Sequence, residues 1–302
     1  MKKTILRPTL AAVGAVLLFS TGGLCIKSLP IPSIAIAGLR SLIAAAFLGI
    51  YLYRRSQQHW LPRISRTGAV GAAGYVVMTI SYVVSMKLTT AANAIFLQYT
   101  MPAWVLIGGA IWLKESITIG RIASIALSLI GMFLFFQDEL TSRQWDGNMA
   151  ALLSGFGYAV VALSLRKDRD SNPIGAVFWG NALTALLVLP ALYWLAPETG
   201  RLLADWRIGA GLLWLGIFQI GVAYLCFVSA LHYLPAIEVA IISLIEPILN
   251  PFWVYLYHGE VPGRWAVIGG VIILFSVLLR NLLREESADK PDEPTDFEAG
   301  MT

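Results

Sequence analysis

Ten long apolar stretches follow one another along the chain, and they limit its fold more than any other feature. Each is about 20 residues long, which is the length a helix needs to cross the hydrocarbon core of a bilayer. Backbone polar groups inside lipid must be paired within the segment, so helices are predicted rather than strands. The predicted spans cover residues 9–28, 33–53, 67–86, 90–113, 120–137, 148–165, 173–195, 208–229, 236–257 and 264–283.

Composition agrees with a protein whose partner is the lipid bilayer. The chain is 57% hydrophobic and only 13% charged, and no soluble core could bury ten such segments. The net charge of +4 comes from basic residues in loops, so nothing favours a nucleic-acid partner. Both cysteines, Cys25 and Cys226, lie inside apolar spans and predict no disulfide framework.

The distribution of Lys and Arg predicts the orientation. With the N-terminus placed in the cytoplasm, fifteen basic residues lie on the cytoplasmic side and six on the opposite side. We therefore expect a multi-pass protein of the bacterial inner membrane with both termini in the cytoplasm. Residues 1–8 form the cytoplasmic N-terminus, and residues 284–302 form an acidic tail whose polar composition predicts disorder.

The spans divide into two halves of five, residues 9–137 and 148–283. A repeat with an odd number of crossings ends on the side opposite its start, so two copies must be inverted. We expect Glu115 and Glu260, which follow the fourth and ninth spans, to be exposed or to cap the next helix. The halves match in order, at similar offsets, at these pairs: Lys27 and Arg166, Pro32 and Pro173, Ala91 and Ala236, Pro102 and Pro247, Glu115 and Glu260.

Several short motifs occur in the same order as in a known family. They are Leu39-Arg40 after Pro32, the segment 94–102 ending in Met-Pro, Lys114-Glu115, the segment 243–247 ending in Glu-Pro, and Gly259-Glu260. In these motifs residues 8–284 resemble the EamA-type transporters of the drug/metabolite transporter superfamily. The resemblance implies an all-α bundle of ten helices, with its two inverted repeats around a central cavity. It implies a cavity lined by helices 3, 4, 8 and 9 and parts of 1 and 6, and export or exchange of a small metabolite.

Two prolines lie at the midpoints of the fourth and ninth spans. Pro102 and Pro247 remove the hydrogen bonds to the carbonyl groups of Gln98 and Ser243, an equivalent pair. Helices broken at matching positions near the midplane are where transporter sites form, so we predict two hinges and a site between them. The alternative is that both prolines only kink helices for packing.

Glu246 is a carboxylate near the predicted bilayer centre, on one helical face with Ser243 and Asn250. Because a bare charge there is costly, it is expected to carry a proton, to hold a substrate amine or to make a structural hydrogen bond. Arg40 is the basic residue inside a span. It is expected to extend to the interface, to neutralise a substrate carboxylate or to pair with Glu246.

Aromatic and polar side chains recur on the helices that carry these residues. A cavity of this kind suits amphipathic amino acids or aromatic metabolites, although tight packing and interfacial belts are the alternative for any single aromatic. The candidate substrate-binding residues are Arg40, Tyr75, Tyr82, Asn93, Gln98, Tyr99, Trp104, Tyr224, Ser243, Glu246 and Asn250.

These features predict a secondary transporter that exports or exchanges amino acids or related metabolites by alternating access. A cationic drug or multidrug exporter is the second hypothesis, and an intramembrane enzyme, a lipid-handling protein, a receptor or a scaffold are weaker ones. No phosphate loop, catalytic triad pattern or metal-ligand spacing is present in the sequence. We predict no enzyme activity, cofactor or metal. Protons are a candidate coupling ion, and monomer and homodimer both stay open.

Overall fold

The structure is a computed structural model that describes residues 2–56, 63–89, 91–137, 144–195, 197–249, 253, 256, 263–265 and 267–276. Every regular element in this part of the chain is a helix. The elements are α1 (Lys2–Ser28), α2 (Ser33–Ser56), α3 (Arg66–Leu88), α4 (Ala91–Gln98), α5 (Met101–Gly108), η1 (Gly109–Leu113), α6 (Ile119–Phe136), α7 (Trp145–Lys167), α8 (Pro173–Leu195), α9 (Thr199–Leu202), α10 (Trp206–Leu213), η2 (Trp214–Val222), α11 (Ala223–Tyr233) and α12 (Ala236–Ser243).

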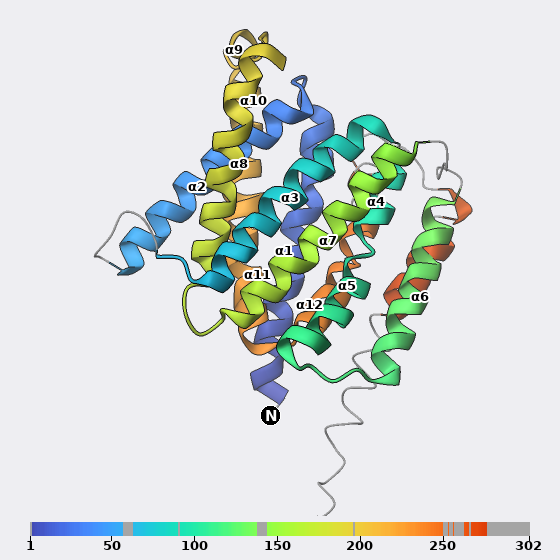
Figure 1. The fold of residues 1–302 in the computed structure, drawn as a ribbon. Coiled ribbons are helices and arrows are strands. Elements are labelled where there is room, and N and C mark those ends of the chain that lie inside the picture. Colours follow the sequence, from blue (N-terminus) through green and yellow to red (C-terminus); the bar gives the residue numbers. More distant parts are fainter. Residues whose placement is uncertain are drawn as a thin grey trace, which may run out of the picture.

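The helices lie side by side as an all-α membrane bundle (Figure 1). Seven helical stretches in the described ranges are long and apolar enough to cross a bilayer, and Ile119–Phe135 and Val267–Ser276 are shorter apolar helices. Helix is present within all ten predicted spans. The connection after α8 contains the short helix α9. The acidic tail lies outside the described residues.

Two membrane helices are interrupted at equivalent positions. After α4 ends at Gln98, residues 99–100 form a turn, and α5 begins at Met101 with a proline in its first turn. After α12 ends at Ser243, residues 244–245 form a turn, and helix resumes over 246–249. All these boundaries are related by the offset of 145 residues that relates Pro102 to Pro247. The breaks predicted from the two prolines are therefore present.

The packing of the helices follows the same repeat. α3 packs along α7 and α8, and the equivalent helices of the other half pair in the same way, with α1 against α11 and α2 against η2. α4 and α5 contact α7, just as α12 contacts α1. α2 and α8 are equivalent helices of the two halves, and they pack against each other at the centre of this arrangement. Each half therefore packs mainly against helices of the other half, as expected for two related repeats.

The last helix of each half pairs with its counterpart. Ser128 Oγ on α6 lies 2.5 Å from Ser276 Oγ, and both side chains are fully buried. A Cβ on Gly269 would lie 2.4 Å from the carbonyl oxygen of Gly131, and one on Gly131 would lie 2.9 Å from that of Gly269. Only glycine permits this approach, since small residues let membrane helices come close together.

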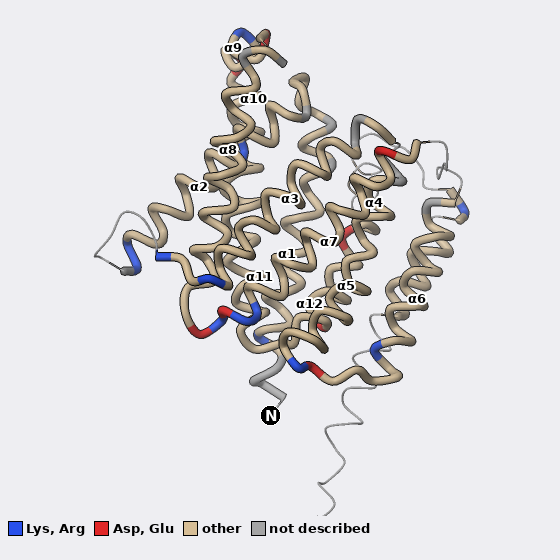
Figure 2. Tube along the Cα trace, viewed as in Figure 1, with Lys and Arg blue, Asp and Glu red and all other residues tan. Residues whose placement is uncertain are grey.

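One end of the bundle carries a concentration of charged residues, as Figure 2 shows below α7 and α8. We call it the basic end, formed by residues 54–55, 63–66, 114–121 and 166–170 together with the N-terminus. Local caps fix its turns. Ser65 accepts a 2.7 Å hydrogen bond from the backbone of Gly68 at the start of α3 and donates to Asp168 Oδ2 at 2.9 Å. This end is the one predicted to face the cytoplasm.

Candidate functional site

The two helix breaks meet through Glu246 and Tyr99. Glu246 is the first residue after the break in the second half, and Tyr99 lies within the break of the first half. The Tyr99 hydroxyl group lies beside the Glu246 carboxyl group and interacts with it. Tyr99 also shares an apolar cluster with Leu244, its counterpart in the repeat. A carboxyl group inside the bundle is thus held where both helices are interrupted, and Glu246 is only half-buried.

A cluster of buried aromatic rings adjoins the breaks. The rings of Tyr75 and Tyr224 are 5.5 Å apart, and Tyr224 packs edge-on against Phe19 at 5.2 Å. Tyr158 lies near Phe227 at 6.2 Å and its hydroxyl group interacts with Ser243. These rings come from α1, α3, α7 and α11, so both halves contribute. Aromatic pairs in such tilted or edge-on arrangements leave hydroxyl groups available for polar contacts.

Arg40 supplies a positive charge within electrostatic range of the same tyrosines. It acts electrostatically on Tyr75, Tyr82 and Tyr224, while Glu246 acts on Tyr82 and Tyr224 as well. Arg40 Nε is buried and has no hydrogen-bond partner among the described residues. No ion pair within 4.0 Å joins Arg40 to Glu246, although both residues are described. The two charges therefore lie apart, with tyrosines within reach of both.

Gln98 and Ser243, predicted to free their carbonyl groups towards the cavity, have packing contacts in the structure. Gln98 Nε2 donates to Ser154 Oγ at 2.7 Å, which joins α4 to α7. A Cβ on Gly155 would lie only 2.6 Å from the Gln98 carbonyl oxygen, so this freed carbonyl lies against α7. Ser243 is fully buried, and its hydroxyl group donates to the Val239 carbonyl at 2.9 Å. These contacts match the packing alternative for these two residues.

Three candidate residues are not placed in the site by the structure. Trp104 is 38% exposed, and its ring packs edge-on against Phe156, which is 46% exposed. Trp104 thus belongs to an exposed apolar surface of the kind that faces lipid. Asn93 lies in α4, but its side chain is outside the described part of the chain, and so is the whole of Asn250.

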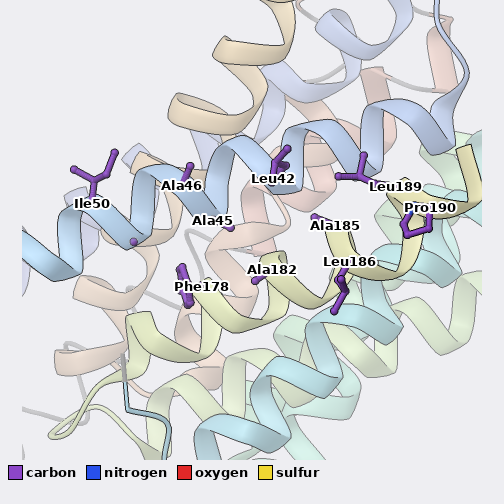
Figure 3. Close-up of a pocket in the computed structure, with 11 residues that line it drawn as sticks. Leu42, Ala45, Ala46, Ile50, Phe178, Ala182, Ala185, Leu186, Leu189 and Pro190 are labelled. Carbon is purple, nitrogen blue, oxygen red and sulfur yellow. The ribbon is translucent and has the colours of Figure 1, made fainter. Parts of the chain in front are cut away.

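An apolar groove of about 590 Å³ lies between α2 and α8 (Figure 3). Its walls include Leu42, Ala45, Phe178, Ala182 and Leu186, and every lining residue is apolar. Ligand sites need a few placed polar groups to fix orientation and specificity. The groove therefore does not serve as the site for a polar substrate.

Sequence reasoning missed three residues that the structure brings to the site. Tyr158 and Ser154 lie four residues apart on α7, and Asn181 on α8 accepts a 3.0 Å hydrogen bond from the Tyr75 hydroxyl group. The i and i+4 spacing of Ser154 and Tyr158, with Gly155 and Gly157 between them, was the signal available in the sequence. Asn181 is fully buried and fixes the Tyr75 ring.

The repeated helical halves, the matched breaks and the charged groups beside them define a multi-pass membrane transporter. The chain belongs to the EamA-like transporter family, whose model matches residues 6–137 and again residues 145–282. It is therefore a transporter and not an enzyme. The two matched segments also show that the halves are copies of one domain.

Proteins similar to this chain are found in archaea and bacteria. An uncharacterized transporter of Archaeoglobus fulgidus is 28% identical over 214 residues, 70% of this chain and 74% of the relative. A probable terminal-alkyne amino-acid exporter of Streptantibioticus cattleyicolor is 25% identical over 281 residues, 90% of this chain and 89% of the relative. A solved crystal structure of another protein covers 92% of this chain and 98% of its own, with a TM-score of 0.78 and 19% identity. That likeness supports the fold.

Proposed function

We propose that the protein exports or exchanges amino acids or related small metabolites by alternating access. The observation that supports this most is the pair of opposite charges, Arg40 and Glu246, with Tyr82 and Tyr224 within range of both. An amino acid presents a carboxylate to the arginine, an ammonium group to the glutamate and an apolar side chain to the rings. The name of the Streptantibioticus relative is consistent with this class of substrate.

Substrate-stimulated counterflow in proteoliposomes tests the proposal. We expect uptake of a labelled amphipathic amino acid to rise when the vesicles are preloaded with it. Glu246→Gln keeps the shape of the side chain and cannot ionise, so transport should fall sharply and lose its dependence on pH. Glu198→Gln is the matched control, because Glu198 is an exposed residue outside the site, at the start of α9. Full transport with an unchanged pH profile in Glu246→Gln would remove Glu246 from the proposal.

A cationic drug exporter is the second candidate, favoured by a carboxyl group among aromatic rings. Arg40 separates the two candidates. Arg40→Gln should weaken counterflow of an amino acid, which presents a carboxylate, and leave uptake of tetraphenylphosphonium unchanged. Loss of both activities to the same extent would show that Arg40 has a structural role and does not bind the carboxylate group of the substrate.

We also propose that the basic end faces the cytoplasm, as the excess of Lys and Arg predicts. Gly200 has open space around it at the far end of the bundle, and Asp170 is exposed at the basic end. A cysteine at position 200 should react with an impermeant thiol reagent in intact cells. A cysteine at position 170 should react only after permeabilisation. The reverse pattern would invert the topology.

A further inference from the structure

The ion pairs that join the two halves, among the described residues, lie at the basic end of the bundle. Glu115 directly follows η1 and Lys114 in the first half, and its Oε1 atom accepts a 3.1 Å hydrogen bond from the backbone N–H of Ala236. Ala236 is the first residue of α12 in the second half. A carboxylate at this position satisfies an otherwise unpaired donor and lies at the positive end of the helix. Glu115 was expected to be exposed or to cap the next helix, and instead it is mostly buried and caps a helix of the other half.

Arg166, the last arginine of α7, adds to the same contact. Its Nε atom lies 3.8 Å from Glu115 Oε1. Its terminal nitrogen donates to the carbonyl oxygens of Leu231 at 2.7 Å and His232 at 2.8 Å, in the last turn of α11. One guanidinium group thus holds the end of α11 and the carboxylate that caps α12.

A second charged pair crosses between the halves close by. Arg121 on α6 lies 3.9 Å from Glu238 Oε1 on α12, with side-chain exposures of 10% and 9%. Arg121 also donates to the Ser116 carbonyl oxygen, so its position is fixed from its own half. Charges buried to this extent are stable only while they are paired, because an unpaired buried charge is strongly destabilising.

Glu115 and the two residues that it contacts each belong to one of the matched pairs in the sequence. Glu115, Ala236 and Arg166 correspond to Glu260, Ala91 and Lys27 in the other half. Glu260 and the side chain of Lys27 lie outside the described residues. Glu and Ala thus recur at two of these positions, and a basic residue recurs at the third.

We propose that Glu115, Arg121, Arg166, Glu238 and the N–H group of Ala236 form a latch that keeps the basic end closed. This latch must come apart when that end opens. The inference rests on the alternating access proposed above and adds the element that controls one side of it. Two of the three contacts between the halves in the latch involve α12, which leads into the break before Glu246. Release of the latch therefore frees the start of the helix that carries the site. Because the charges are buried while paired, the closed state and the opened state are two discrete arrangements.

The test measures access to the centre of the bundle from each side of the membrane. Ser243→Cys in a chain whose native cysteines are replaced by serine gives a reporter that is fully buried in the closed state. Its rate of reaction with an impermeant thiol reagent is compared in inside-out and right-side-out vesicles. We expect Glu115→Gln or Glu238→Gln to raise the rate from the basic end about tenfold, because loss of one charge-assisted bond changes a population ratio by that order.

Matched variants separate the latch from a general effect of charge. Asp170→Asn removes an exposed carboxylate at the same end, whose 3.3 Å pair with Arg169 lies within one half, and should leave the rate unchanged. Arg121→Glu should raise the rate, and the double variant Arg121→Glu with Glu238→Arg should restore it. Thermal unfolding of each variant identifies those that are folded. If Glu115→Gln does not fold, the charge-swapped pair still gives a result.

An unchanged rate from the basic end in folded Glu115→Gln and Glu238→Gln, or no restoration in the charge-swapped protein, would overturn the latch. The reaction requires no substrate, so it does not depend on which metabolite is carried. Normal amino-acid counterflow with no change in labelling would reject the latch alone. A labelling change in a protein that shows no amino-acid counterflow would support the latch and reject the proposed substrate.

Discussion

Gly155 provides a quantitative test of how the first helix break is held. A Cβ at this position would lie 2.6 Å from the Gln98 carbonyl oxygen and 3.1 Å from that of Leu97. Ordinary contact begins at 3.4 Å, so α7 and α4 would have to separate by ~0.8 Å in Gly155→Ala. Both obstacles are backbone atoms next to the break, and neither can move away as a flexible side chain does.

Such overpacking costs about 1–3 kcal/mol in folded proteins. The same substitution also improves helix propensity by up to about 1 kcal/mol. Gly14→Ala, in α1, measures that gain alone, because nothing lies within 4 Å of the added Cβ. The difference between the two variants therefore isolates the cost of the clash.

Thermal unfolding in detergent and counterflow in proteoliposomes provide the measurements. With about 2–4 °C per kcal/mol for a chain of a few hundred residues, Gly155→Ala should unfold several degrees below Gly14→Ala. It should also transport more slowly, because the break is displaced relative to Glu246. Equal unfolding temperatures in the two variants would show that α4 and α7 do not touch at the break as described.

The structure and the sequence predict the outcome of three further changes to the chain. Tyr75→Phe should lower the free energy of unfolding by about 1–2 kcal/mol, since it leaves the buried Asn181 without its donor; unchanged thermal unfolding would contradict this. Ser128→Ala and Ser276→Ala should be coupled by about 0.5–1 kcal/mol in a double-mutant cycle, and strictly additive effects would argue against their contact. Truncation after Glu286 should leave counterflow intact, because the acidic tail has the composition of a solvated chain; loss of transport at normal expression would show that the tail is required.

The architecture could be predicted from the sequence because lipid limits the possibilities. Span length, the odd number of spans in each half and the two prolines predicted the helices, the repeat and the breaks after Gln98 and Ser243. The proximity of Glu246 to the first break follows from the same symmetry, although the sequence did not single out Tyr99 as its neighbour. These features depend on local composition and on the repeat.

Contacts between distant helices could not be predicted in the same way. Trp104 lies on a helix next to the site, but residue type alone does not say which face of an apolar helix points to lipid. The partner of Glu115 is a backbone N–H group more than a hundred residues away, and no side-chain pattern marks it. Pro102 predicts that the Gln98 carbonyl group is free to face a cavity. In the structure α7 approaches this carbonyl group at Gly155, and the sequence does not show that contact.

The interleaved packing of the two halves has a consequence for assembly in the membrane. α3 is inserted long before α7 and α8, the helices it packs against, have been synthesised. Its buried polar groups, such as the Tyr75 hydroxyl, must then stay unpaired in lipid or form other hydrogen bonds until Asn181 has been synthesised and inserted. Neither half can complete its own interior. A gene fragment that encodes five spans should therefore yield a stable product only when the complementary fragment is made in the same cell.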